Sequence, residues 1–427
     1  MMLELLKREL KALPCEAWEL TLREEERWEF YYIGHKLDQN RAVILQEAEV
    51  KVYQKSEDGK YLGSALDVIS PTATEEEIRA TLEKLLFQAG LVKNPYYTLT
   101  DLPVTAAPRT DPVDVAAIAK DCITALGQVP ENETRRINSY EIFVSGITRH
   151  TLNSNGVEYV CTYPSTEMEV VVNARKEDHE IELHRIYHSG TCDRKRLEAD
   201  VAEVMRFGED RLRAVSTPML GKTNVLFTTS DACEIYSYFT DRMHADFVVR
   251  KFSDWKIKEP VGNDLRGDKV TVEIVPELPN SSKNYPVDPE GCEVFARYLI
   301  RDGVAENYCG SRQFSQYLGL AKSSLATNIR VSGGTKTEEE LRKGDYLEIV
   351  EFSDFQVSSA SGDIAGEIRL GYLHRGDEVL VVTGGSVTGS MQEAMTDMRF
   401  SKETIQYDNR EIPKATLLKG LRITGGC

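Results

Sequence analysis

A strict alternation of apolar and polar residues near the end of the chain constrains the fold most. Within residues 364–373, large apolar side chains fall on one face and charged ones on the other: Ile368, Leu370 and Tyr372 against Glu367 and Arg369. A period of two is typical of a strand with one buried face. After the turn LHRGDEV, residues 379–383 return as a second strand rich in β-branched residues. The pattern therefore predicts a β-hairpin.

Paired glycines mark the ends of predicted strands. Gly384 and Gly385 end the return strand of the hairpin, and Gly333 and Gly334 follow another apolar run. Glycine at such a place lets the backbone approach a neighbouring segment closely. Neither pair opens a long helix in the manner of the GxxxxGK[ST] or GxGxxG loops. We therefore expect tight strand ends and no nucleotide site.

Length and charge exclude several classes of function. A chain of 427 residues exceeds the size at which one core keeps growing, which predicts two or three domains. No apolar run approaches the roughly 20 residues of a membrane-spanning helix. The 69 acidic residues outnumber the 52 basic ones, and the formal net charge of −17 opposes binding to nucleic acid. We expect a cytoplasmic protein with no membrane contact and no direct nucleic-acid contact.

The first half of the chain alternates strand and helix signals. Charged residues interrupt the N-terminal stretch MMLELLKRELKALP, which predicts a short amphipathic helix and no signal peptide. Thr74 with Glu77 predicts a capping box, and Asp111 before Pro112 predicts the cap of a second helix. The proline-rich residues 95–112 predict a loop or subdomain boundary. Strands are predicted at residues 15–22, 26–33, 47–54 and 61–69, and again over 135–188 with a tight turn at LNSNG.

The second half is richer in strands and glycine. Residues 193–215 predict a helix with a break near Gly208, and Ser230 predicts the cap of a helix that reaches about Met243. Thr337 with Glu340 predicts a short capped helix. The fold class predicted is α+β with two domains. The first, residues 1–206, combines an antiparallel or mixed sheet with helices, and the second, residues 207–427, is β-rich.

The eight cysteines are scattered, and no two form a CxxC pair. In a chain without a secretory signal this predicts reduced thiols packed as small apolar residues, with metal or disulfide use as the alternative. Cys427 ends the chain as a terminal thiol without a motif around it. Cys233 has no base at helical spacing, so packing is predicted for it and not nucleophilic catalysis.

The order and spacing of six stretches resemble the TldD/PmbA family, also called the modulator-of-DNA-gyrase or U62 peptidase family. The resemblance covers about residues 130–426. The stretches are LNSNG at 152–156, VDPEG at 287–291, LIRDGVAENYCGSRQFSQYLG at 299–319, ATNIRVSGG at 326–334, FSDFQVSSASGDIAGEIRLGY at 352–372 and VTGGSVTG at 382–389.

The resemblance implies a dimeric bacterial protein with an α+β N-terminal domain and a β-rich C-terminal domain. Family members of the TldD type carry a His-Glu-x-x-x-His zinc site on a helix in the C-terminal half and act as peptidases on small or unfolded peptides. Members of the PmbA/TldE type lack the zinc ligands and serve as the partner subunit. The link to gyrase is a family-level implication, since nothing in this acidic chain predicts DNA contact.

The letters His-Glu-x-x-x-His occur here at 179–184, as HEIELH. The surrounding pattern predicts two strands of a hairpin, on which His179 and His184 would point to opposite faces. The resemblance places the zinc helix elsewhere, at about residues 230–246, where His244 and Glu234 lie ten residues apart. Two donors that far apart make no zinc site. We therefore predict no metal site and no catalytic residue in this chain, with His179, Glu180 and His184 as the alternative metal site.

Polar loop residues are the candidates for a peptide groove. The resemblance places Asn328, Ser361, Gly362 and Asp363 near an internal cleft. Tyr236 and Tyr238, on the helix predicted after Ser230, are further groove candidates, with core or dimer contacts as the alternative. Asp288 and Glu290, beside Gly291, suit a cation site or a turn, and the order Pro, Asp, Gly favours the turn.

These observations predict a PmbA/TldE-like, zinc-free subunit of a TldD/TldE-type metallopeptidase. It would pair with a TldD-like catalytic subunit, which alone would hold zinc, or with itself, and would help to hold an extended peptide at a strand edge. Two alternatives stay open: an autonomous metallopeptidase that uses HEIELH, and a non-enzymatic homodimeric scaffold that binds peptides.

Overall fold

The computed structural model describes residues 2–101 and 103–426. Up to Leu212, the chain builds one six-stranded sheet in the order β3-β2-β1-β4-β5-β6, and every neighbouring pair is antiparallel. Its strands are β1 (Ala17–Ile33), β2 (Lys36–Lys55), β3 (Leu62–Ile69), β4 (Arg135–Asn153), β5 (Glu158–Lys176) and β6 (His179–Ser189). The helices of this part are α1 (Met2–Ala12), α2 (Glu75–Leu91), α3 (Val115–Gln128) and α4 (Arg194–Leu212).

Two further sheets follow in the C-terminal part. In the larger one, β13 pairs with both β8 and β14, which closes β13, β8, β20, β16 and β14 into a ring. Its strands are β7 (Val215–Ser216), β8 (Gly221–Phe227), β13 (Tyr346–Val357), β14 (Asp363–Arg375), β15 (Glu378–Thr383), β16 (Ser386–Ser390), β17 (Arg399–Phe400) and β20 (Thr416–Thr424). The smaller sheet holds β9 (Val272–Val275), β10 (Arg297–Arg301), β11 (Val304–Ala305), β12 (Asn328–Val331), β18 (Thr404–Tyr407) and β19 (Arg410–Pro413). Short helices complete this part: α5 (Ala232–Arg242), α6 (Ala245–Val249), α7 (Arg312–Tyr317), α8 (Glu338–Leu341), α9 (Met391–Ala394) and η1 (Met395–Asp397).

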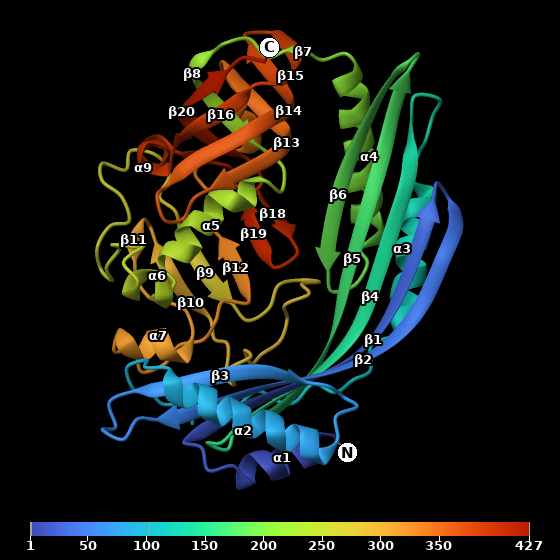
Figure 1. Cartoon of the computed structure of the whole chain (residues 1–427). Helices are drawn as coiled ribbons and strands as arrows, with labels where there is room; N and C mark the ends of the chain where they lie inside the picture. Colours follow the sequence, from blue (N-terminus) through green and yellow to red (C-terminus); the bar gives the residue numbers. More distant parts are fainter. Residues whose placement is uncertain (1, 102, 427) are drawn as a thin grey trace.

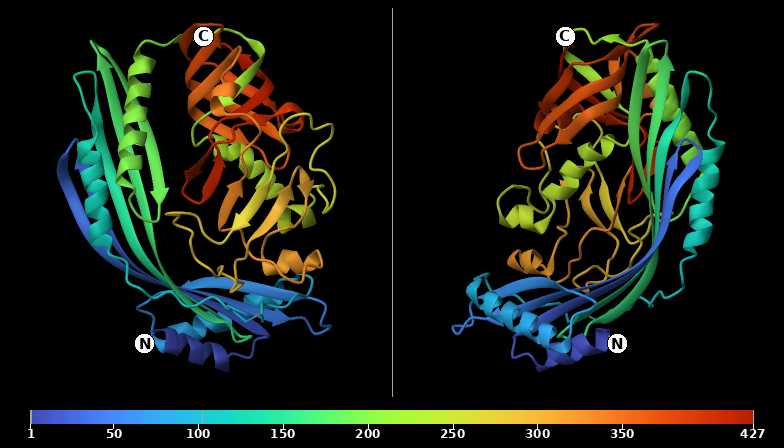
Figure 2. Two further views of the ribbon diagram at one scale, coloured as in Figure 1. Left: turned by 180° about the vertical axis from the view of Figure 1, so that it is seen from behind. Right: turned by 45° about the vertical axis from the view of Figure 1, so that its right-hand side comes forward.

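The long strands of the first sheet wrap around the C-terminal part. Strands of 17 to 20 residues twist strongly along their length, so the same sheet forms the base of the molecule at one end and a side wall at the other (Figures 1 and 2). Helices α1 and α2 cover it at the base, and α3 and α4 cover it along the wall. Helix α4 thus lies between the wall and the C-terminal sheets.

The structure confirms the α+β class and most of the predicted elements. The hairpin of β14 and β15 turns at Gly376, and both capping boxes form, Thr74 with Glu77 and Thr337 with Glu340. HEIELH lies on β6, as the alternation predicts. The turn interpretation of Asp288 is also confirmed, because its carboxylate accepts backbone N–H groups of Glu290, Cys292 and Leu325.

Three predicted helix details are wrong. Helix α3 is capped by Asp114 and not by Asp111, since the Asp114 side chain reaches the N–H of Ala117 at 2.9 Å. Asp231, not Ser230, precedes α5. Helix α4 runs through Gly208 without a break. A Cβ there would lie 3.0 Å from the Cβ of Ala174 on β5, so this glycine serves close packing of helix on sheet.

Residues 95–101 and 103–112 form a strap along the C-terminal part. Thr98 bonds to Gln316, Thr105 to Glu293 at 2.8 Å, and Arg109 to Glu277. The C-terminal sheets begin after Leu212, with β7. The C-terminal part therefore lies against the wall and the base of the first sheet, and the strap runs along it.

The glycine pairs end strands where two backbones meet closely, as the sequence predicts. Gly385 has φ of +83°, and a Cβ there would lie 2.2 Å from the carbonyl oxygen of Thr424. A Cβ at Gly334 would similarly lie 2.1 Å from the carbonyl oxygen of Phe400. Gly376 offers a contrast, because its φ is +56° and no atom lies within 4 Å of the Cβ position.

This contrast yields a test of the close approach. Gly376→Ala should cost only the left-handed backbone conformation, about 1–2 kcal/mol. Gly385→Ala should cost that amount and the steric displacement of Thr424 as well, for a loss of about 3 kcal/mol or more in the free energy of unfolding. Urea unfolding of both variants measures the difference. Equal losses would contradict the close approach at Gly385.

Candidate functional site

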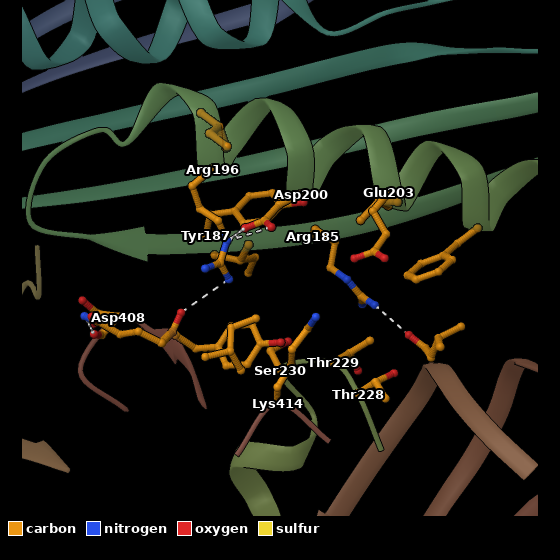
Figure 3. A pocket seen from close by; sticks show the side chains of 18 of the residues that line it. Arg185, Tyr187, Arg196, Asp200, Glu203, Thr228, Thr229, Ser230, Asp408 and Lys414 are labelled. Carbon is orange, nitrogen blue, oxygen red and sulfur yellow. Dashed lines mark hydrogen bonds and ion pairs between the residues drawn. The ribbon is translucent and has the colours of Figure 1, made fainter. Parts of the chain in front are cut away.

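A cleft of about 780 Å³ lies between the wall of the first sheet and the C-terminal part. This volume is in the range of ligand-binding clefts, roughly 300–1,000 Å³. Strand β6 and helix α4 line one side, and the segment before α5, strands β13 and β14 and the β18–β19 hairpin line the other. Figure 3 shows Arg196, Asp200 and Glu203 of α4 pointing into the cavity, opposite Ser230 and Lys414.

Strand β6 brings an unpaired edge to this cleft. It is the last strand of its sheet, and no backbone hydrogen bond in the part of the chain that the structure describes joins it to a strand other than β5. Arg185, Ile186, Tyr187, His188 and Ser189 of this strand all line the cleft. The row of free N–H and C=O groups along such an edge pairs readily with another extended chain.

A second strand edge reaches the same cleft from the C-terminal part. Strand β18 ends the smaller sheet and contributes Ile405, Gln406 and Tyr407 to the lining. The carbonyl oxygen of Gln406 accepts a hydrogen bond from Arg196 at 3.4 Å. Since Arg196 also bonds to Asp200 at 2.7 Å, α4 is tied to this edge.

Charged side chains of opposite sign alternate along the cleft walls. Lys414 pairs with Glu338 at 2.9 Å, and Arg342 pairs with Glu348 at 2.7 Å. On the facing wall, burial raises the pKa of Asp200. Apolar side chains lie between and beneath these groups: Met168, Leu197, Val204, Phe207 and Val350. The cleft therefore offers both apolar and charged surface to a ligand.

A partly buried ion pair crosses from one side of the cleft to the other. Arg185 on β6 donates to both carboxylate oxygens of Glu351 on β13, one bond being 2.9 Å long. Glu351 is 4% exposed, and burial raises its pKa to about 7, a rise that Arg185 opposes. Nearby, the hydroxyl of Tyr372 on β14 donates to Asp210 on α4 at 2.6 Å. These contacts fix the spacing between β6 and the C-terminal part.

The candidate groove residues of the sequence lie away from this cleft. Asn328 is fully buried on β12, where its amide bonds to Ser281 and to the carbonyl of Pro276. Tyr236 and Tyr238 are at most 2% exposed and pack in the C-terminal core, which is the alternative named for them. Ser361, Gly362 and Asp363 form a loop beside Gln392, and none of the six lines the cleft. A groove role stays a prediction for all six residues.

The HEIELH segment does not gather donors for a metal ion. On β6 the histidines face opposite sides of the sheet, with His179 opposite Lys176 and His184 opposite Val171. His184 bonds to Glu169 at 3.2 Å. Within residues 2–101 and 103–426, no group of three or more His, Cys, Asp or Glu side chains is placed to hold a metal ion. Cys427 lies outside the described residues.

Helix α5, where the resemblance places a zinc site, also does not fit one. The Arg410 guanidinium donates to the carbonyl oxygen of Cys233 and to the Ser237 hydroxyl. Burial raises the pKa of Cys233 to about 12, which disfavours the thiolate that a metal ligand or a nucleophile needs. His244 caps α6 and contacts Asp246 instead. A fixed guanidinium beside the helix opposes a second cation.

The cleft residues of α4 escaped sequence analysis, although their pattern is visible. Arg196, Asp200 and Glu203 follow one another at spacings of four and three, so they share one helix face. A charged stripe of this kind is typical of a face in water. Only the position of α4 between two sheets makes this face the wall of a cleft.

Comparisons with known proteins agree with this architecture. Residues 220–425 match the PmbA/TldA metallopeptidase C-terminal domain. Over 209 residues the chain is 22% identical to Metalloprotease PmbA of Escherichia coli O157:H7. That match covers 48% of this chain and 46% of the curated relative, so it spans about half of that protein's length.

Solved structures match over nearly the whole chain. TldE from Thermococcus kodakarensis has a TM-score of 0.78 at 15% identity, covering 99% of this chain and 100% of the other. A protein of Thermotoga maritima described as a modulator of a DNA gyrase has the same TM-score and coverage at 17% identity. At these identities the likeness shows a shared fold. No helix in the described part of the chain is long and apolar enough to cross a membrane.

The ion pair across the cleft predicts a specific pH dependence. The pKa of Glu351 is about 7 in the folded protein against 4.5 without burial, so between these pH values the folded state keeps a proton that the unfolded chain has lost. The contribution of the Glu351 carboxyl group to the free energy of unfolding is complete below pH 4.5 and is lost as the pH rises to 7. Relative to a Glu351→Gln variant, the wild-type free energy of unfolding should fall by about 3 kcal/mol over this window.

Urea unfolding at a series of pH values measures this difference. Glu367→Gln on β14 is the matched control, since Glu367 is exposed and pairs with Arg369 at 3.4 Å. The control curve should run parallel to the wild type. A Glu351→Gln curve that is also parallel would show that Glu351 does not titrate near neutrality.

Proposed function

The chain belongs to the TldD/PmbA family, and on that premise we propose that it is the PmbA/TldE-like, zinc-free subunit of a TldD/TldE-type metallopeptidase that acts on small or unfolded peptides. One observation carries the proposal: a cleft bordered by the free edge of β6 lies in a chain whose described residues gather no metal ligands. The cleft holds the substrate, and the catalytic zinc belongs to the partner.

The free edge supports extended peptides as the substrate class. A peptide that adds to an edge strand is held by main-chain hydrogen bonds, which are the same for every sequence. Folded proteins have few free extended segments, so such a cleft selects small or unfolded chains. The edges of β6 and β18 line the same cleft, which gives an extended peptide a possible pairing surface on either side.

The state of α5 supports a zinc-free chain. A half-buried Cys233 with a raised thiol pKa and the guanidinium of Arg410 lie at the helix where the resemblance places zinc. His179 and His184 do not supply a substitute. These residues count against the autonomous metallopeptidase, whereas the homodimeric peptide-binding scaffold shares every feature of the cleft and differs only in the partner.

The partner completes the active site in this proposal. A TldD-like catalytic subunit would bring the zinc site to the peptide held at the cleft, in the cytoplasm. The match to Metalloprotease PmbA, over 46% of that protein's length, agrees with an origin among such peptidases. No nucleic-acid contact is part of this function, which agrees with a net charge of −17.

Metal analysis together with co-purification tests the zinc assignment. The chain purified alone should hold less than about 0.1 zinc per molecule, because it lacks a tetrahedral set of donors. The complex recovered from the native host should contain a TldD-like chain, about one zinc, and peptidase activity that the separate chain lacks. Stoichiometric zinc in the chain alone, lost in His184→Ala, would reject the proposal. Recovery without a TldD-like chain and without peptidase activity would favour the scaffold.

Backbone-methylated peptides test how the substrate is held. In an extended peptide, alternate N–H groups face the strand, so methylating that set should weaken binding about tenfold per amide, the value of one lost hydrogen bond. Methylating the other set is the matched control, with unchanged side chains and little expected effect. Fluorescence anisotropy of an unstructured nine-residue peptide measures both. Equal weakening by the two sets would mean that the peptide does not pair with a strand.

A further inference from the structure

Two cysteines from distant parts of the chain lie close together beside helices α3 and α4, on the wall that borders the cleft. Cys122 lies on α3, and Cys192 lies in the connection between β6 and α4, directly before the capping residue Asp193. Helices α3 and α4 pack side by side, and Cys192 packs against the core cluster that contains Cys122. Both thiols are free in this structure.

Contacts on both sides hold the connection in place. After Cys192, the Arg194 guanidinium lies 3.9 Å from the carboxylate of Asp121 and donates to Gln128 at 3.2 Å, so it reaches α3 on either side of Cys122. Before Cys192, the N–H of Gly190 donates to the carbonyl oxygen of Asn280 at 2.7 Å. The Cys192 thiol is therefore kept next to α3 by its neighbours.

The two thiols differ in access to solvent. Cys122 is fully buried, whereas Cys192 is half-buried. A hydrogen bond with Cys192 is the largest of the causes that raise the pKa of the Cys122 thiol, and burial is the next. Both causes favour the protonated form of the Cys122 thiol. Cys192 is the member of the pair that an external reagent meets first.

We propose that Cys122 and Cys192 form a reversible disulfide when the protein meets a small disulfide oxidant such as oxidised glutathione. The thiolate of Cys192 attacks one sulfur of the oxidant, forms a mixed disulfide and releases one reduced glutathione. The thiol of Cys122 then attacks the sulfur of Cys192, and its proton goes to the departing sulfur, which leaves as the second reduced glutathione. The two protein thiols are oxidised, and one disulfide is reduced to two thiols.

The bond would fasten the start of α4 to α3. Asp193 and Arg196, which line the cleft, follow Cys192 within one turn of helix. The connection also carries the contacts of Gly190 and Thr191 to Asn280 on the facing side. Oxidation of the two thiols would thereby restrain one wall of the cleft. This inference does not rest on the proposed function, because it concerns only the chemistry of two thiols.

The experiment uses the full-length chain, first reduced and then exposed to oxidised glutathione. Titration should show two of the eight thiols lost, and non-reducing peptide mass mapping should show residue 122 linked to residue 192. Cys192→Ser should abolish the linked peptide. Cys122→Ser should leave glutathione bound on Cys192, because the attacking thiol is missing. Reduction with dithiothreitol should restore all eight thiols in the wild type.

Cys15→Ser is the matched control, since Cys15 is also half-buried and lies in another core cluster. This variant should form the same linked peptide as the wild type. Circular dichroism of each reduced variant checks that the fold is kept. The proposal is overturned if Cys192 of the wild type retains glutathione, stays unmodified, or links to a cysteine other than Cys122.

Discussion

The free edge of β6 is the constraint on which the rest of the structure depends. A six-stranded sheet with long, twisted strands has two ends, and here one of them faces the C-terminal part across a cleft. An edge strand exposed to water invites pairing with other chains, and proteins cover or blunt such edges. In this molecule α4 and the C-terminal sheets shelter the edge, and among residues 2–101 and 103–426 none of their strands pairs with it. The partly buried pair of Arg185 and Glu351 sets the distance between the edge and the C-terminal part.

Local signals in the sequence were enough to predict most of the elements. The alternation in β14, the Asn-Gly turn between β4 and β5, and the capping boxes at Thr74 and Thr337 each depend on residues close together in the chain. The pattern of residues around HEIELH also predicted a strand, on which His179 and His184 point to opposite faces. The caps that failed, Asp111 and Ser230, each lie close to an aspartate that occupies the capping position. Competing caps a few residues apart are not distinguished by sequence alone.

The cleft could not be predicted in the same way, because its parts meet only in the fold. Arg185 and Glu351 are 166 positions apart, and the contact of Arg196 with Gln406 spans 210 positions. A charged stripe on α4 has the same pattern whether it faces water or a cavity. The resemblance to a known family supplied the architecture, yet the groove candidates drawn from it lie in the core or on a separate loop. Site residues therefore required the positions of the sheets.

Amide hydrogen exchange of the complex with a bound, uncleaved peptide tests the pairing at β6 most directly. The account predicts that alternate amides of residues 180–189 become protected when the peptide binds, since only every second N–H points to the free edge. Amides on β3, the other edge of the same sheet, should exchange as before. Unchanged exchange along β6 while the peptide is bound would contradict the account.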